Sequence, residues 1–156
     1  MINLAKNNFF DTSALLSNYK LNPNDINYIS DLVFQELEDI KTSHSKDEII
    51  KYKARSLVRY LMSHRDLWRT CNTNWDHVVR LLNKHSSASL RDNNDSYLIC
   101  EARCLAKNDK IQFITSDAAQ YLLACGFEEL EPVYYKETSH KENLWKGFKE
   151  FTLNDE

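Results

Sequence analysis

Two short apolar segments of the chain each run into an aspartate that is accompanied by hydroxyl residues. Phe9 and Phe10 lead into Asp11, and the apolar stretch at 111–114 leads through a threonine and a serine into Asp117. A carboxylate at the carboxyl end of a strand lies at the edge where open α/β sheets bind their ligands. If the two strands are neighbours in a parallel sheet, both aspartates meet at one edge although they are far apart in the sequence.

Two further acids are placed to join them. Glu36 lies in a segment whose apolar residues recur at helical spacing, and Asp95 lies in the first turn of a helix predicted after a turn-forming run. Each acid also has an ordinary structural explanation, because aspartates cap helices and turns and glutamates are common on helix surfaces. Their order and positions together predict one shared site, which consists of Asp11, Glu36, Asp95 and Asp117.

A cluster of four carboxylates requires positive charge. Carboxylates within a few ångströms of one another resist joint ionisation unless a cation neutralises them. Ligation by oxygen alone, with no His or Cys nearby, selects hard ions such as Mg²⁺ or Mn²⁺, which also bind substrate phosphates. Such an ion activates water and stabilises the leaving oxygen during attack on a phosphodiester. The sequence therefore predicts a Mg²⁺ or Mn²⁺ cofactor at the four acids.

Length and composition bound the class of protein. The chain has 156 residues, 42% of them hydrophobic, which suits one compact domain. It begins with no apolar leader segment, and no apolar run approaches the roughly 20 residues of a membrane helix. We therefore expect a cytoplasmic protein without membrane contact. The four cysteines form no CxxC pair and no zinc-type spacing, so buried free thiols are expected.

Strands and helices are expected to alternate, which predicts a parallel sheet covered by helices on both faces. The predicted strands lie near 8–10, 26–29, 111–114 and 132–135, and the predicted helices lie at 12–17, 32–40 and 47–62, after 95 and after 117. The stretch at 63–94 is ambiguous between strand and helix, and a long connection of this kind could shape a substrate groove. Gly126 is predicted to end the last of these helices in a left-handed conformation.

A basic stripe lies on the segment predicted to be the strongest helix. Lys51, Arg55 and Arg59 recur every four residues beside a separate apolar face. The net charge of −3 argues against non-specific nucleic-acid binding by the whole molecule, but it leaves room for a local patch. The stripe is therefore a candidate contact for a phosphate backbone, and a solvated outer face is the ordinary alternative.

Four segments resemble the motifs of PIN-domain nucleases and occur in the same order. They are 9–16 around Asp11, 33–41 around Glu36, 94–99 around Asp95, and 113–117, which ends in Asp117. The second segment is most similar to the PhoH-type branch of the family. The resemblance covers roughly 7–135 and implies a three-layer α/β/α fold, with a parallel sheet of about five strands in the order 3-2-1-4-5. It divides the chain into a nuclease domain at 1–135 and a tail at 136–156, which is expected to be helical.

The resemblance also implies roles for single residues. The four acids would form the catalytic metal site, and Ser13 and Thr115 would be hydroxyl neighbours that contact the substrate. Asp92 competes with Asp95 for the third acidic position, because both precede the same helix. The apolar pair that follows at 98–99 favours Asp95.

The function that the resemblance implies is metal-dependent cleavage of single-stranded RNA, or less often of DNA. The main alternative is a PIN-like module that keeps its acids but only binds RNA or protein. A toxin that is held by an antitoxin is a subset of the nuclease hypothesis. One helical face of the tail could fold back or meet a protein partner such as an antitoxin, and it consists of Leu144, Trp145, Phe148 and Phe151. A homo-oligomer is a separate possibility.

Three other uses of a strand-end aspartate do not fit the sequence. A phosphatase of the Asp-x-Asp type needs a second acid where Ser13 stands, and an adhesion-type Asp-x-Ser-x-Ser metal site fails at Leu15. A receiver domain needs an acidic pair near the first strand and a lysine after a later strand, and the sequence has neither.

Overall fold

The computed structural model describes residues 5–84, 93–106 and 109–136. Asp92 and the apolar face of the tail at 144–151 lie outside the described residues. The choice between Asp92 and Asp95, the helical tail and its docking role therefore stay predictions. Among the described helices, none has the length and apolar character needed to cross a membrane.

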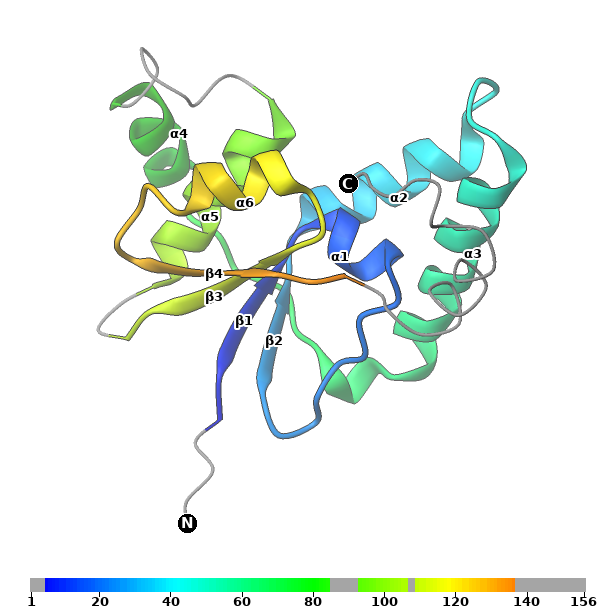
Figure 1. Cartoon of the computed structure of the whole chain (residues 1–156), viewed down its shortest axis with the longest axis horizontal. Helices are drawn as coiled ribbons and strands as arrows, with labels where there is room; N and C mark the ends of the chain where they lie inside the picture. Colours follow the sequence, from blue (N-terminus) through cyan, green and yellow to red (C-terminus); the bar gives the residue numbers. More distant parts are fainter. Residues whose placement is uncertain (1–4, 85–92, 107–108, 137–156) are drawn as a thin grey trace, which may run out of the picture.

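A parallel sheet of four described strands forms the centre of the molecule (Figure 1). The strands are β1 (Asn7–Phe10), β2 (Ile26–Ile29), β3 (Ile111–Thr115) and β4 (Leu130–Tyr134), in the spatial order β2-β1-β3-β4. β1 and β3 pair directly, with Phe10 opposite Ile114. The two strands that run into Asp11 and Asp117 are therefore neighbours, and both acids lie at the carboxyl edge of the sheet.

The outer edge of β2 is met by a single residue instead of a full strand. Arg69 forms an isolated parallel bridge with Tyr28: its N–H donates to the Asn27 carbonyl at 2.9 Å, and its carbonyl accepts from the Ile29 N–H at 3.0 Å. This bridge occupies the place of the third strand in the order 3-2-1-4-5. The three-layer α/β fold is confirmed, and four described strands stand where about five were expected.

Helices connect the strands, and polar side chains fix where several of them begin. Ser30, Asp47 and Asn93 each accept a hydrogen bond from a backbone N–H in the first turn of the helix that follows. The described helices are α1 (Thr12–Leu16), α2 (Asp31–Thr42), α3 (Glu48–Ser63), the 3₁₀ turn η1 (Arg65–Leu67), α4 (Trp75–Lys84), α5 (Asn94–Leu105) and α6 (Ala118–Ala124).

The helices lie in two layers around the sheet. In Figure 1, α1, α2 and α3 gather on one side of the strands and α4, α5 and α6 on the other. The central strands are consequently buried on both faces, since Phe9 and Phe10 point in opposite directions and both have 0% exposed surface. The ring of Phe9 stacks on that of Phe113, with centroids 5.7 Å apart. These contacts hold the two acid-bearing strands side by side.

The structure decides one choice that the sequence left open and contradicts one local prediction. The ambiguous apolar residues at 78–82 lie in α4, whose buried side is formed by Val78 and Leu82. Gly126 does not adopt a left-handed conformation, so that prediction is wrong; α6 ends at Ala124, and the Gly126 N–H donates to the Leu123 carbonyl at 3.2 Å. The positive φ angles among the described residues belong to Asn18 and Asn72.

A buried acid anchors α5. Glu101 is 1% exposed, and its carboxylate accepts a hydrogen bond from the Thr73 hydroxyl. Burial raises the pKa of the Glu101 carboxyl, and the neighbouring Ser30, Thr73 and Cys71 offset this rise only in part. Thr73 belongs to the segment that follows the Arg69 bridge, so the contact ties α5 to the β2 side of the sheet. The first turn of α5 carries Asp95.

Substitution of Glu101 by Gln should flatten the pH dependence of stability. The pKa of the Glu101 carboxyl is higher in the folded protein than in the unfolded chain. The stability that Glu101 contributes is therefore fully present below its pKa in the unfolded chain, and it is lost as the pH rises through its pKa in the folded protein. Between these two pKa values, the free energy of unfolding of the wild type should fall by up to about 1.4 kcal/mol per pH unit relative to that of E101Q. Urea unfolding from pH 4 to pH 8 measures the difference, with exposed Glu128→Gln as the control. Parallel profiles for wild type and E101Q would contradict the prediction.

The cysteines differ in exposure. Cys71 and Cys100 are buried, Cys104 is partly buried and Cys125 is exposed, and all four are free thiols. The expectation of buried thiols is therefore correct for the first two and wrong for Cys125. Burial raises the pKa of Cys100 to about 11 and that of Cys71 further still. Cys125 lies directly after α6.

Candidate active site

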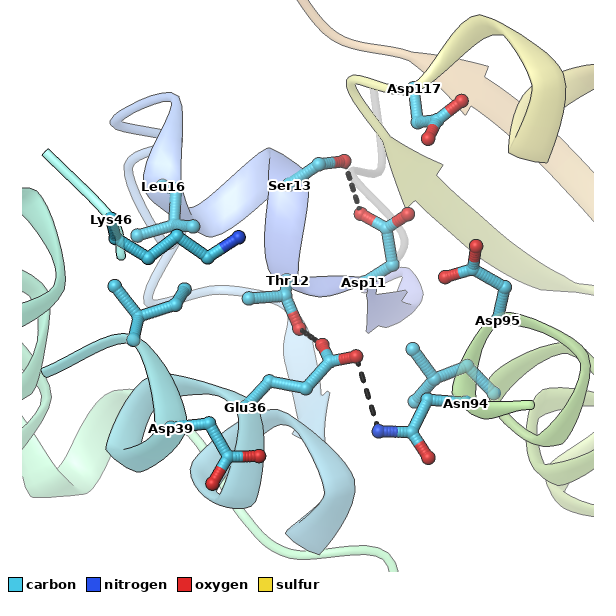
Figure 2. A pocket seen from close by; sticks show the side chains of 12 residues that line it. Asp11, Thr12, Ser13, Leu16, Glu36, Asp39, Lys46, Asn94, Asp95 and Asp117 are labelled. Carbon is cyan, nitrogen blue, oxygen red and sulfur yellow. Dashed lines mark hydrogen bonds between the residues drawn. The ribbon is translucent and has the colours of Figure 1, made fainter. Parts of the chain in front are cut away.

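A pocket of about 430 Å³ lies at the carboxyl edge of the sheet, between α1, α2, α5 and the start of α6 (Figure 2). All four predicted acids line it, although they come from four separate segments. Asp39 is a fifth acid in its lining, and Leu16, Ile40 and Leu98 supply apolar wall. The predicted acids are Asp11, Glu36, Asp95 and Asp117.

Asp11 is the most enclosed of these carboxylates, with 4% of its surface exposed. Its Oδ1 accepts from the Ser13 hydroxyl at 2.7 Å and from the Ala14 N–H at 3.2 Å, and its Oδ2 accepts from the Thr115 hydroxyl at 2.5 Å. Asp11 therefore caps α1 and is also held across the strand boundary by β3. Asp11 thus serves both as the N-cap of α1 and as a lining residue of the pocket.

The hydroxyls predicted to neighbour the acids join the two strand ends. Ser13 Oγ accepts from the Ser116 N–H at 2.9 Å, and Thr115 Oγ1 accepts from the Asp117 N–H at 3.0 Å. Asp117 in turn caps α6, because its Oδ1 accepts from the backbone N–H groups of the first turn. Ser13 and Thr115 are thus placed beside the acids as expected. Their contact with a substrate stays a prediction.

Glu36 is held by two residues that the sequence did not single out. The Thr12 hydroxyl donates to Glu36 Oε1, and the Asn94 side-chain amide donates to Oε2 at 3.2 Å (Figure 2). Thr12 and Asn94 each directly adjoin a predicted acid in the sequence, which was the one available signal. Adjacency alone does not distinguish a residue that orients a carboxylate from one that faces elsewhere.

Asp95 is electrostatically coupled to each of the other three predicted acids. Burial raises the pKa of Asp95, and the charges of Glu36 and Asp117 raise it further. Burial also raises the pKa of Asp11; its hydrogen bonds from Thr115, Ser13 and Ala14 oppose that rise, and the charge of Asp95 adds to it. Asp95 is therefore the acid through which the charges of the pocket are coupled.

The donor chemistry of the pocket fits a hard divalent cation, because its acidic side chains offer only oxygen. In their present rotamers the carboxylates do not converge on a point: no group of three or more acidic, His or Cys side chains among the described residues is arranged to hold an ion. Both oxygens of Glu36 accept hydrogen bonds within the protein. Joint ligation by the four acids would require side-chain rotation and stays a prediction.

The basic stripe does not belong to this pocket's lining. Lys51, Arg55 and Arg59 lie on α3, and none of them is among the residues that line it. Lys51 also forms an ion pair with Glu48 at 3.4 Å. The lining contains a different base, Lys46. A role of the stripe in guiding a phosphate backbone stays a prediction.

The fold and pocket can be compared with known proteins. A search against protein-family models gives no match, and a search of curated proteins gives none either. Among solved structures, the chain is similar to a member of the VapBC family of toxin-antitoxin systems, VapBC-5, from Mycobacterium tuberculosis. The TM-score is 0.58 with 15% sequence identity, and the match covers 82% of this chain and 98% of the other. The chain has a PIN-like fold.

The likeness to the VapBC-5 structure concerns the fold. At 15% identity it does not transfer an activity, and it does not distinguish the PhoH-type branch from other PIN-like proteins. The PIN-like arrangement does explain why four sequence-distant acids share one pocket. Parallel strands bring Asp11 and Asp117 to one edge, and α2 and α5 bring Glu36 and Asp95 to the same place.

Proposed function

We propose that this protein is a Mg²⁺- or Mn²⁺-dependent nuclease that hydrolyses phosphodiester bonds in single-stranded RNA. The observation that carries the proposal is the pocket that four acids from separate segments line, with Asp95 coupled to the other three. Capping accounts for Asp11 and Asp117 individually, but it does not account for Glu36 and Asp95 facing the same space. Like charges gathered in this way are a cost to folding unless they serve a ligand.

The residues that line the pocket would have different roles in the reaction. Asp11, Asp95 and Asp117 would hold the cation, and Glu36 would join them or orient water after release from its protein partners. The bound ion would supply activation of water and stabilisation of charge on the phosphate. Ser13 and Thr115 hold the Asp11 carboxylate in one orientation, because both hydroxyls donate to it.

Thr12 and Asn94 have a similar effect on Glu36. They hold its carboxylate in the pocket through hydrogen bonds to both oxygens, while the aliphatic stem extends from α2. The apolar wall formed by Leu16, Ile40 and Leu98 limits the space that water can fill. A charge in such a setting interacts more strongly with a cation or phosphate than it would in bulk water.

A protein partner is part of the proposal. The similar solved structure is a member of a toxin-antitoxin family, which supports a toxin whose activity an antitoxin restrains. A catalytically silent RNA- or protein-binding module is the second candidate, and it is favoured by the hydrogen bonds that already engage both carboxylate oxygens of Glu36 within the protein. These two candidates differ in one measurable property, the cleavage of RNA in the presence of metal.

The deciding experiment is an assay of the purified chain on matched single-stranded RNA and DNA oligonucleotides. We expect cleavage of RNA with Mn²⁺ or Mg²⁺, weaker or no cleavage of DNA, and none when a chelator is present in excess. Restoration of activity by added Mn²⁺ after chelation would show that the metal acts reversibly. RNA binding without cleavage under every metal condition would support the silent module instead.

A further inference from the structure

Lys46 is the base that lines the acidic pocket. It lies in the connection between α2 and α3, and its ammonium extends over the pocket toward Thr12 in Figure 2. Among the described residues, the other charged members of the lining are all acids. Glu36 projects between Lys46 on one side and Asp95 on the other (Figure 2). In the part of the chain that the structure describes, Lys46 is therefore the one positive charge that faces the carboxylates of the pocket.

The backbone around Lys46 is fixed on both sides. The Lys46 N–H donates to Ser43 Oγ at 3.2 Å, and the next residue, Asp47, caps α3 by accepting from the Ile50 N–H at 3.0 Å. The direction in which the Lys46 side chain leaves the chain is consequently set by the end of one helix and the beginning of the next. The side chain itself is exposed and can reach a ligand.

The neighbouring lysines are engaged differently. Lys41 pairs with Glu38 at 3.5 Å and Lys51 pairs with Glu48 at 3.4 Å, each within its own helix. No ion pair joins Lys46 to another side chain in the described part of the chain. Lys46 is therefore available to an incoming anion at the pocket, whereas Lys41 and Lys51 already have acidic partners.

A pocket of carboxylates repels a polyanion, so a nucleic acid needs a local cation where it enters. A lysine ammonium binds phosphate as a compact point charge. Resting on the proposed nuclease function, we propose that Lys46 holds a backbone phosphate adjacent to the one that is cleaved. Its place across Glu36 from Asp95 assigns it to the neighbouring phosphate, because the cleaved phosphate must reach the acids themselves.

The rival role for Lys46 is that of an internal counter-ion for Glu36 and Asp39. The two roles predict opposite effects of Lys46→Ala. A phosphate contact predicts weaker RNA binding with unchanged affinity for Mn²⁺. A counter-ion predicts tighter Mn²⁺ binding, because the lysine no longer neutralises the same carboxylates, and little change in the affinity for RNA.

The test compares wild type, K46A, K46R and K110A on a fluorescent single-stranded RNA. Lys110 is a matched control, since it is exposed and precedes β3 at the opposite edge of the sheet. We expect K46A to raise KM about tenfold with a small change in kcat, K46R to restore most of the loss, and K110A to match the wild type. In the Asp11→Asn background, addition of K46A should make the negative slope of log affinity against log salt shallower by about 0.7.

The outcomes separate this inference from the function on which it rests. Absence of metal-dependent cleavage by the wild type would overturn the nuclease proposal itself. An active wild type with an unchanged KM and salt slope for K46A would overturn the phosphate contact alone. Tighter Mn²⁺ binding by K46A, measured by calorimetry, would also overturn it in favour of the counter-ion.

Discussion

Asp11→Asn is expected to reduce metal-dependent cleavage of single-stranded RNA by on the order of 10³-fold, the scale on which groups that act directly on a transition state are lost. Asn keeps the size of the side chain and remains a good helix cap. One carbonyl oxygen can still accept from Ser13 or Thr115, but the negative charge of the most enclosed of the four predicted acids is gone. A gel-based cleavage assay with Mn²⁺ measures the loss.

The fold of this variant should stay intact. Burial raises the pKa of Asp11, so its charge is held at a cost and its removal should leave the thermal midpoint equal or slightly higher. Asp66→Asn is the matched control, because Asp66 is an exposed acid in η1, away from the pocket lining. Undiminished cleavage by a pure, folded D11N protein would remove Asp11 from the active site.

Asp95→Asn should stabilise the metal-free protein and abolish its response to Mn²⁺. Asp95 lies in the first turn of α5, where the helix dipole favours an acid by about 0.3–1 kcal/mol. Its raised pKa shows that burial and the charges of Glu36 and Asp117 outweigh this benefit. Removal of the charge should therefore raise the free energy of unfolding slightly with chelator present, and the gain stays small because solvent screens the exposed Asp95 side chain. Chemical unfolding measures this gain.

With metal present the order of stabilities should reverse. At 100 times its dissociation constant, Mn²⁺ adds about 2.7 kcal/mol to a protein that binds it only when folded. The wild type should show this gain, and D95N should show little of it. Asp76→Asn is the control, since Asp76 is a first-turn acid of α4 outside the pocket and its loss should slightly destabilise that helix. Equal Mn²⁺ gains in D95N and wild type would exclude Asp95 as a ligand.

The sequence predicted those parts of the fold in which the residue types reflect whether a segment is buried. Phe9, Phe10 and Phe113 are apolar because both faces of a central parallel strand are covered, and the acid after each such strand marks its carboxyl end. The helices α2 and α3 lie close to the predicted ranges 32–40 and 47–62, and their N-caps Ser30 and Asp47 act over only a few residues. The gathering of four acids in one pocket then follows from the order of the strands.

Features that depend on tertiary contacts could not be predicted in the same way. The third strand is reduced to the Arg69 bridge, and no local pattern distinguishes one bridged residue from a short strand. Lys46 stands in a polar connection that any solvated loop could contain, and only the packing of α2 beside α1 brings it over the acids. Gly126 was assigned a left-handed cap from its identity, although the turn after α6 closes without one.

The unequal exposure of the thiols has a practical consequence. A maleimide dye at neutral pH should react first at Cys125, because Cys71 and Cys100 are enclosed and hold their protons tightly. Asp117 and Cys125 lie at opposite ends of α6, so a fluorophore on Cys125 would be separated from the acids by the length of this helix. The chain thus carries a natural attachment point from which ligand arrival can be followed optically without altering a pocket residue.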